Sequence, residues 1–466
     1  MSPPVAADLP PLPPFSDRGR PAVPFSAQRA SSGSAEHRQP ISRSSSSASI
    51  PFDDDEVDVV RVEGLRHAHI RLEARRYKSA AFAEDLLNVL RSLKLHPWNH
   101  ADITSQALKI QKVSGSLTNA VFFVSCPSAP ILPTLLLRIY GPSSGALISR
   151  PRELHILHAL SSRYHIGPRV YGTFENGRVE EFFESTTLTA RDLRNPKISS
   201  WIGARMAELH DVDIAVVELQ SPPATPTFEE SSDVTTWPIA VTKNVKSWLL
   251  LAREVLTLPT VSEELRSALD LDRFKAEWDQ YIRWLGKNEK ELGSSPVVFA
   301  HNDTQYGNLL RLAATPKEAA TGHRQIIVVD FEYASPNPAA FDIANHFHEW
   351  TADYHSDVPH LLRPDRYPTV DERYNFYRSY LAHHQHSCAS SADEDSAPEP
   401  VDVQLSRLDS QVRAWSPSSH AMWALWGLVQ AREALEGKDS EPEFDYVAYS
   451  QCRMESFRRE LKALLA

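Results

Sequence analysis

Two polar blocks set into apolar flanks constrain this sequence more than any other feature. The first is VVFAHNDTQYGNLL at 297–310, and the second is IIVVDFE at 326–332. In each block a short apolar run typical of a buried strand leads into carboxylate or amide side chains, which must be hydrogen-bonded or functional if they are buried. An Asp- and Asn-rich turn is the structural alternative. Two such blocks in order, with a strand between them, favour a functional site.

The side chains in these blocks match the needs of phosphoryl transfer from a nucleotide. One carboxylate, Asp303, can orient a hydroxyl group and accept its proton. The amide of Asn308 and the carboxylate of Asp330 can hold Mg²⁺ on the phosphates. The spacing therefore predicts a kinase-type reaction with Mg²⁺ as its cofactor.

Composition excludes several other classes of protein. The 466 residues allow two or three structural units, and the net charge of −11 argues against nucleic acid or an anionic membrane as the main partner. No run of about 18 apolar residues occurs, so we expect no membrane span. The three cysteines are far apart in the chain, which is typical of reduced thiols in a cytoplasmic protein.

Biased composition marks two segments outside the globular pattern. Residues 1–50 contain 12 Ser and 9 Pro, and such a segment buries too little apolar surface to offset its chain entropy. We predict that residues 1–55 are disordered. The stretch 387–402 is acidic and contains proline, which predicts a surface loop inserted between helices.

The pattern of apolar residues divides the remaining chain into two parts. Leucines at helical spacing predict a helix near 85–95, and β-rich runs predict strands at 120–125, 135–141 and near 170–183. A further helix is expected near 150–165. After about residue 196 the pattern is mostly helical. A cleft between two such lobes is a usual place for a ligand.

The motifs resemble those of the choline/ethanolamine kinase family, and most closely its fungal branch. The resemblance rests on the sequences LLLRIYG, IGPRVYGTF, AHNDTQYGNLL and VDFEYASPNPAAFDIANHFHEW, and it covers about 105–466. It implies an α+β, protein-kinase-like fold with two lobes. The small β-rich N-terminal lobe would span 56–182, and the larger helical C-terminal lobe would span 183–466. ATP and Mg²⁺ would be the cofactors.

The resemblance assigns roles within the two polar blocks. Asp303 would be the base facing the choline hydroxyl, Gln305 would help to position the reacting groups, and Asn308 and Asp330 would hold Mg²⁺. Glu332 would support the metal indirectly. The histidines of the NHFHEW run, at 346 and 348, are expected to have structural roles.

The nucleotide would bind in the front lobe. The family's phosphate loop matches VSGSLTNAVF at 113–122. Arg138 lies on a predicted strand, where its guanidinium could bind phosphate oxygens by two hydrogen bonds. Glu153, in a predicted helix, could hold Arg138 by an ion pair; a solvated helix face is the alternative. The residues expected to bind ATP are Ser114, Gly115, Ser116, Asn119, Arg138 and Glu153.

The acceptor pocket is expected in the helical lobe. A quaternary ammonium group donates no hydrogen bonds, so aromatic faces and a nearby carboxylate must bind it. The family's choline pocket matches Tyr333, Glu349, Tyr354, Trp423, Trp426, Phe444 and Tyr449. Aromatic residues at helical spacing are also typical of a core, which is the alternative.

The function implied by the resemblance is ATP- and Mg²⁺-dependent phosphorylation of choline to phosphocholine, the first step of phosphatidylcholine synthesis by the CDP-choline route. An ethanolamine kinase, or an enzyme with dual activity, is the nearest alternative. A binding module without activity and an antibiotic phosphotransferase remain as more distant alternatives. By analogy with the family, we expect a homodimer.

Overall fold

The computed structural model describes most of the part of the chain expected to be globular. It describes residues 62, 64–99, 102–113, 119–140, 149–218, 238–313, 322–384, 399–437 and 444–466. The predicted disordered tail 1–55 lies outside the described residues, as do Ser114, Gly115, Ser116 and positions 387–398 of the predicted insertion.

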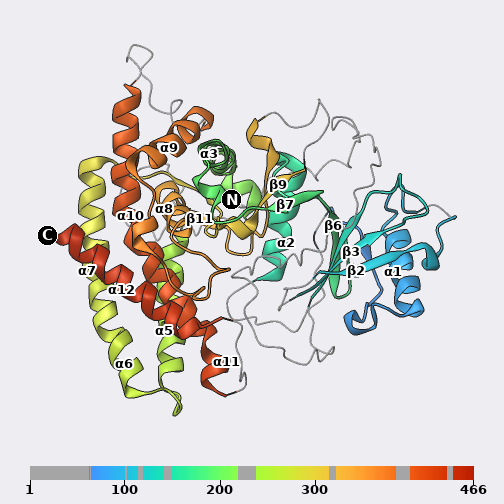
Figure 1. Ribbon diagram of the computed structural model, residues 1–466, viewed down its shortest axis with the longest axis horizontal. Coiled ribbons are helices and arrows are strands. Elements are labelled where there is room, and N and C mark those ends of the chain that lie inside the picture. Colours follow the sequence, from blue (N-terminus) through green and yellow to red (C-terminus); the bar gives the residue numbers. More distant parts are fainter. Residues whose placement is uncertain are drawn as a thin grey trace, which may run out of the picture.

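A six-stranded sheet with the strand order β1-β5-β6-β4-β3-β2 lies in the lobe at one end of the molecule (Figure 1). Its strands are β1 (His67–Ala68), β2 (Lys109–Lys112), β3 (Asn119–Ser125), β4 (Leu135–Tyr140), β5 (Val170–Phe174) and β6 (Gly177–Glu181). Neighbouring strands are antiparallel except β1 and β5, which are parallel. The strands predicted in this part of the chain are confirmed.

Helix α1 (Ala80–Ser92) packs against this sheet and confirms the helix expected near 85–95. The side chain of Ser79 caps its first turn by accepting a hydrogen bond from the backbone N–H of Phe82. The apolar face of α1 and the sheet bury a common core, in which Phe82 lies 6.1 Å from Phe122 between ring centroids. The front lobe therefore has a core of its own.

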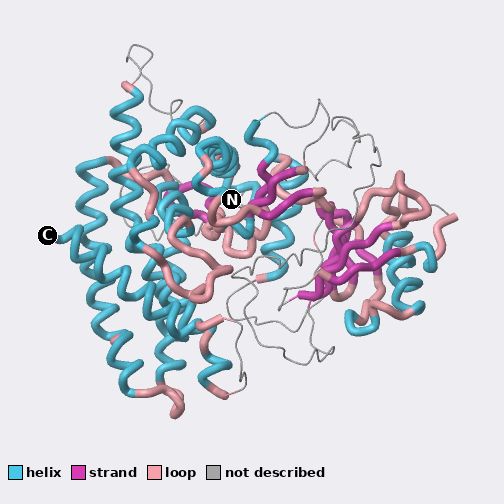
Figure 2. The backbone as a smooth tube through the Cα atoms, viewed as in Figure 1, coloured by secondary structure: helices cyan, strands magenta, loops and turns pink. Residues whose placement is uncertain are grey.

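Helices form most of the other lobe (Figure 2). They are α3 (Pro196–His210), α4 (Ile214–Val217), α5 (Ala240–Leu256), α6 (Glu263–Leu269), α7 (Leu271–Leu292), α8 (Ala339–Glu349), α9 (Val370–His383), α10 (Val401–Gln430), α11 (Arg432–Leu435) and α12 (Tyr446–Leu465). Every residue of α8 is buried, and α10 packs against α5, α8 and α12. The expected helical second part is confirmed.

Two small antiparallel sheets bring the polar blocks together between the lobes. Strand β8 (Val297–Ala300) pairs with β11 (Ser335–Pro338), and β9 (Leu309–Leu312) pairs with both β7 (Ser185–Thr187) and β10 (Ile326–Val328). The polar residues of the first block, 301–308, thus lie between β8 and β9, and those of the second block, Asp330 and Glu332, follow β10. Pairing of β9 with β10 places the two blocks next to each other.

Two helices bear on where the predicted loop insertion and the predicted front lobe end. Helix α10 begins at Val401, so the loop predicted to reach residue 402 ends two residues earlier. Pro400 precedes the first turn, and Asp402 lies where the helix dipole favours negative charge. Helix α2 (Arg150–Ala159) contributes its buried side chains to the larger, helical core. The boundary at 182 stays a prediction.

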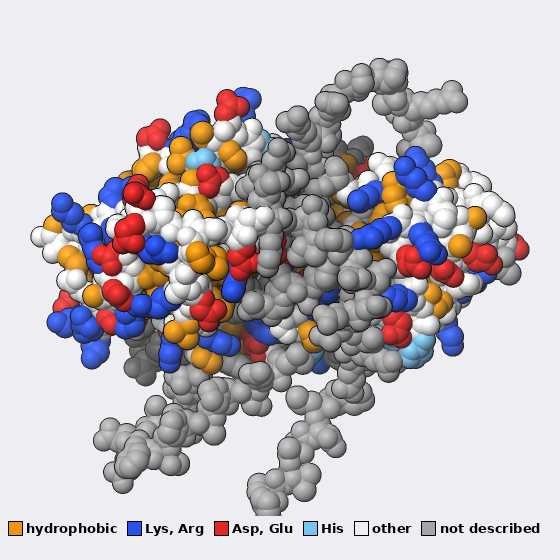
Figure 3. All heavy atoms as spheres, turned by 90° about the horizontal axis from the view of Figure 1, so that it is seen from below, with side chains coloured by type: hydrophobic (Ala, Val, Ile, Leu, Met, Phe, Trp, Pro, Cys, Tyr) orange, Lys and Arg blue, Asp and Glu red, His pale blue; other side chains and the backbone are white. Residues whose placement is uncertain are grey.

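Among the described residues, no helix combines the length and the apolar character that crossing a bilayer requires. On the face seen in Figure 3, acidic and basic side chains are interspersed over both ends of the molecule.

Candidate active site

The first polar block folds into a tight loop around Asp303. Strand β8 delivers the loop into the protein interior, where only 1 % of Asp303 is exposed. The Nδ2 atom of Asn308 donates hydrogen bonds to the backbone oxygen and to Oδ2 of Asp303, each at 3.0 Å. Gln305 caps the short turn at 306–308, because its Oε1 accepts from the backbone N–H of Gly307 at 2.9 Å. The loop thus holds the Asp303 carboxylate in a fixed orientation.

A carboxylate from the start of helix α8 holds the backbone of this loop. Oδ2 of Asp342 accepts from the N–H of His301 at 3.0 Å, and Oδ1 accepts from the N–H of Asn302 at 2.8 Å. Burial alone would raise the pKa of Asp342, but the hydrogen bond and the charge interaction with His210 outweigh burial and lower it. Asp342 is therefore a fixed anion that shapes the loop.

The second polar block brings Asp330 to the same region. The backbone N–H of Val329 donates to the oxygen of Asn308 at 3.0 Å, which joins the two blocks directly. Asp330 has φ 70°, a left-handed conformation that is costly for most residues and is found at functional sites. Burial, reinforced by the negative charge of Asp330, raises the pKa of the neighbouring Glu332 well above its ordinary value. The polar blocks thus concentrate carboxylates at one point.

A cavity of about 340 Å³ lies between the front sheet and this carboxylate cluster. Its apolar wall includes Val121 and Phe123 of the sheet and Phe331 of the second block. Of the residues predicted for ATP and metal binding, Arg138, Glu153 and Asp330 line it. Asn119 begins strand β3, and only its backbone is described. The structure therefore brings Arg138, Glu153 and Asp330 to one cavity.

The prediction of an ion pair between Arg138 and Glu153 is wrong. Glu153 instead accepts from Nη2 of Arg178 at 2.8 Å, while Nε of Arg138 lies 3.6 Å from Oε1 of Glu180. Arg178 also donates to Glu180. The cause is strand register: Arg138 on β4 and Arg178 on β6 are directly opposite, so the two cations require two acids. Burial alone would raise the pKa of Glu153, but Arg178 lowers it.

We expect the Arg178→Met variant to lose about 3–5 kcal/mol of unfolding free energy, because Glu153 and Glu180 would be left buried without their main counter-ion. The matched control is Arg253→Met. Its partner is Asp272, the two side chains are 42 % and 86 % exposed, and we expect a loss of about 1 kcal/mol at most. Urea denaturation of both variants gives the comparison. Equal losses of unfolding free energy in the two variants would show that the buried cluster stabilises the fold no more than an exposed ion pair does.

All seven residues predicted for the choline pocket lie together in the helical lobe. Ring centroids are 5.4 Å apart for Tyr333 and Trp423, 5.2 Å for Trp423 and Trp426, 6.1 Å for Trp426 and Tyr449, and 5.5 Å for Tyr449 and Phe444. All four pairs meet edge to face, which is a favourable geometry. The rings also belong to the larger buried core.

Glu349 is the carboxylate of this aromatic cluster. Its Oε2 accepts from the hydroxyl of Tyr354 at 2.7 Å, and its Oε1 accepts from Nη2 of Arg453 at 3.2 Å. Neither charged side chain of the Glu349–Arg453 pair is exposed. Arg453 also donates to the hydroxyl of Tyr449 at 3.0 Å. The Glu349 carboxylate therefore lies among the aromatic rings and is paired with the Arg453 guanidinium.

Asn345 joins the aromatic cluster to the loop that carries Asp303. Its Nδ2 donates to the backbone oxygen of Asn302 at 3.0 Å, and its Oδ1 accepts from Nε1 of Trp423 at 2.7 Å. A second connection runs through Tyr333, whose backbone oxygen accepts from Asn302 at 2.9 Å and whose hydroxyl accepts from Trp426 at 2.8 Å. The loop that carries Asp303 and the ring cluster are one hydrogen-bonded unit.

Sequence reasoning assigned no role to several residues in and around the candidate site. Asp342 and Asn345 lie three residues apart in the long motif, and that helical spacing was a usable signal. Arg178 and Glu180 alternate on one strand, which places them on the same face. For Arg453 the sequence offers no signal that separates it from an arginine on a solvated helix face.

His346 has a structural role, as expected. Its Nδ1 donates to the backbone oxygen of Thr304 at 2.7 Å, and its Nε2 accepts from Nε1 of Trp350 at 3.2 Å. A proton on Nε2 would face the indole N–H, so the neutral ring fits this site. Burial lowers the pKa of His346 to about 4.

We expect acid to destabilise the protein through this histidine. Below about pH 6.5 the unfolded chain binds a proton at His346 that the folded protein binds only near pH 4, so stability falls as the pH falls through this window. From pH 7 to pH 5 the loss from this residue is about 2 kcal/mol. Urea denaturation at both pH values should show a smaller loss in His346→Gln. An unchanged pH dependence would contradict the prediction.

The two lobes, the joined polar blocks and the cavity between them define a phosphotransferase of the protein-kinase-like fold. The family model for choline/ethanolamine kinase matches residues 110–458, and this chain belongs to that family. A choline kinase from Schizosaccharomyces pombe is 33% identical over 426 residues, which cover 82% of this chain and 90% of that protein. A choline kinase and an ethanolamine kinase from Saccharomyces cerevisiae are 34% and 30% identical; each match covers 77% of this chain, and 64% and 67% of those proteins.

Solved structures agree with the fold. The crystal structure of a choline kinase from Cryptosporidium parvum has a TM-score of 0.59 at 23% sequence identity, and the match covers 82% of this chain and 95% of that chain. A Plasmodium vivax ethanolamine kinase has the same TM-score at 24% identity, and the match covers 82% of this chain and 91% of that kinase. The predicted two-lobed, kinase-like fold is confirmed.

Proposed function

We propose that this protein transfers the terminal phosphoryl group of ATP to the hydroxyl of choline and so forms phosphocholine. The observation that carries the proposal is the direct connection between the Asp303 loop and the aromatic cluster through Asn345. A carboxylate suited to activating a hydroxyl thus belongs to the same rigid unit as rings suited to a quaternary ammonium group. The choline kinases among the relatives support the same acceptor.

Asp303 would orient the choline hydroxyl and accept its proton. Its Oδ2 is held by Asn308, so the carboxylate needs little reorganisation when the substrate binds. Positioning dominates phosphoryl transfer because the transition state is loose. Gln305 would complete the positioning of the reacting groups from its buried place in the loop.

Asn308 and Asp330 would hold Mg²⁺. Both offer the oxygen ligands that this ion prefers. Because Nδ2 of Asn308 is committed to Asp303, Oδ1 is the atom that remains for a metal. Bound Mg²⁺ would neutralise charge on the phosphates. Glu332, buried beside Asp330, would support this site indirectly.

The nucleotide would occupy the cavity between the front sheet and Asp330. Of the two opposed arginines, Arg138 is the one suited to reach a phosphate, because 22 % of its side chain is exposed against 2 % for Arg178. Glu153 would act through Arg178 rather than on Arg138 directly. We retain Ser114, Gly115, Ser116 and Asn119 as the proposed phosphate loop.

The test is an ATP-consumption assay of the purified protein with choline, ethanolamine and an aminoglycoside as separate acceptors. We expect the highest kcat/KM with choline and measurable turnover of ethanolamine. Turnover of the aminoglycoside alone would indicate an antibiotic phosphotransferase. No turnover of any acceptor by folded protein would indicate a binding module without activity.

We expect Trp423→Ala to raise the KM for choline roughly tenfold, since one aromatic face contributes about 1–2 kcal/mol to binding a methylated cation. The KM for ethanolamine should rise less, because its ammonium group relies more on hydrogen bonds. The matched control is Trp415→Ala on the same helix, where the indole instead donates to Glu289 at 2.9 Å. An equal loss for both acceptors in Trp423→Ala would assign Trp423 to core packing.

The same proposal places the enzyme in the cytoplasm, at the first step of phosphatidylcholine synthesis by the CDP-choline route. By analogy with the family we also propose a homodimer. Light scattering coupled to size-exclusion chromatography distinguishes a dimer from a monomer of 52.3 kDa.

A further inference from the structure

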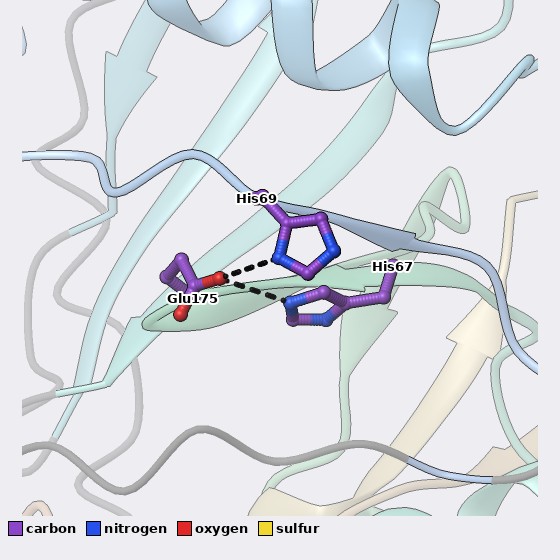
Figure 4. Close-up of side chains that lie close together, drawn as sticks. All are labelled: His67, His69 and Glu175. Carbon is purple, nitrogen blue, oxygen red and sulfur yellow. Dashed lines mark hydrogen bonds and ion pairs between the residues drawn. The ribbon is translucent and has the colours of Figure 1, made fainter.

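Two histidines and a glutamate converge at the edge of the front sheet (Figure 4). His67 begins strand β1, His69 follows it, and Glu175 lies in the turn between β5 and β6. Residues two apart on an extended segment project to the same side, and both rings face the glutamate. The potential ligand atoms of the three residues all lie within 4.8 Å of one another.

The spacing of these atoms suits a small divalent cation. Oε1 of Glu175 lies 3.3 Å from Nε2 of His67 and 3.1 Å from Nδ1 of His69. Ligands about 2.0–2.1 Å from a tetrahedral zinc ion are separated by about 3.3 Å. The two glutamate–histidine distances therefore already match this geometry, and the two imidazole nitrogens, within 4.8 Å of each other, complete a compact set of ligands.

A neighbouring hydroxyl orients the first imidazole. Nδ1 of His67 lies 2.9 Å from Oγ1 of Thr173, its cross-strand partner, and only 1 % of Thr173 is exposed. Histidines that bind metals usually hydrogen-bond through the other ring nitrogen, which fixes the ring and its tautomer. When Thr173 accepts from Nδ1, the lone pair of Nε2 points towards Glu175.

The backbone around the cluster is held on both sides. The N–H of Glu175 donates to the oxygen of Ile70 at 3.2 Å. The buried side chain of Asn176 accepts from the N–H of Leu72 at 3.0 Å and donates to its oxygen at 2.9 Å. Segment 67–72 is thus fastened to the β5–β6 turn, which pre-organises the ligands.

The chemistry of the ligands indicates which ions fit. Two imidazoles and one carboxylate suit Zn²⁺ and its neighbours in the first transition row, whereas Mg²⁺ prefers oxygen. The side chain of His69 is 70 % exposed, so water can complete the coordination. None of the three residues lines the nucleotide cavity. A second group of similar composition, His348, His420 and Glu460, is less suited because the Arg453 guanidinium lies 3.2 Å from His420.

We propose that His67, His69 and Glu175 bind a divalent transition-metal ion, with Zn²⁺ as the best fit, which ties strand β1 to the β5–β6 turn. The site is separate from the one proposed for Mg²⁺ and does not depend on the proposed reaction. Its expected effect is structural, because an ion that binds only the folded arrangement raises the stability of the front lobe.

The experiment is a Zn²⁺ titration of the chelator-treated, full-length protein in excess Mg²⁺, against a chromophoric competitor. The variants are His69→Ala, whose exposed side chain can be removed without disturbing the core, and Glu175→Gln, which keeps the shape of the side chain. His360→Ala is the control, since it removes a partly exposed imidazole from the other lobe. Sites elsewhere bind equally in all four proteins, so differences report this cluster.

We expect wild type and His360→Ala to bind one equivalent of Zn²⁺ that is weakened at least tenfold in His69→Ala and in Glu175→Gln. Zn²⁺ should also raise the melting temperature of wild type and His360→Ala, but not that of His69→Ala. Equal stoichiometry and affinity in wild type, His69→Ala and Glu175→Gln would overturn the proposal. So would a loss of the same size in the His360→Ala control.

Discussion

Replacement of Asp303 by Asn is expected to lower kcat for choline by at least about a hundredfold, because a positioned general base contributes about 10²–10⁴-fold in rate. The substitution keeps the size of the side chain and an oxygen that can accept from Asn308. The fold and the binding of MgATP should therefore be retained. Steady-state kinetics give kcat, and calorimetric titration with MgATP serves as the control. Near-full turnover in the folded variant would remove Asp303 from the role of base.

Loss of the Asp330 carboxylate is expected to abolish activity and to remove the Mg²⁺ dependence of ATP binding. Asp330→Ala is the larger change, but alanine tolerates the left-handed conformation at φ 70° poorly, so part of its effect would be backbone strain. Asp330→Asn separates the two effects, because asparagine adopts this conformation more readily and lacks only the charge.

Calorimetric titration of both Asp330 variants with ATP, with Mg²⁺ and with a chelator, measures the metal dependence directly. We expect both to bind ATP equally with and without Mg²⁺, whereas wild type binds more tightly with the metal. Binding of MgATP by Asp330→Asn as tight as that of wild type would show that Asp330 is not a metal ligand.

The sequence predicted those parts of the site whose chemistry is local. Asp303 and Asn308 lie in one short loop, so the sequence pattern alone suggests that they act together, whereas the aromatic residues of α10 were assigned to a pocket only through the family resemblance. The division into a β-rich front part and a helical back part follows from the change in periodicity near the middle of the chain, and the kinase-like fold class follows from the family resemblance. These signals depend on neighbours within a few residues, and such neighbours are visible in a sequence.

Which buried arginine pairs with which buried glutamate could not be predicted in the same way. Glu153 pairs with Arg178 because β4 and β6 align position 138 with position 178, and nothing local fixes that register. Arg453 reaches Glu349 from a helix more than a hundred positions later in the chain. Contacts of this kind depend on how separate elements pack.

The hydrogen bonds of Asn345 have a consequence for how acceptor preference can evolve in this enzyme. A substitution that reshapes the ring cluster at Trp423 also removes a donor to Asn345, whose Nδ2 holds the backbone oxygen of Asn302 in the loop that carries Asp303. If the proposed roles of the ring cluster and of Asp303 hold, selection for a larger or smaller amine at this position acts on turnover as well as on recognition. Adaptation to a new amine should be easier at Phe444, whose ring contacts Tyr354, Tyr446 and Tyr449 and makes no hydrogen bond to Asn345 or to the loop.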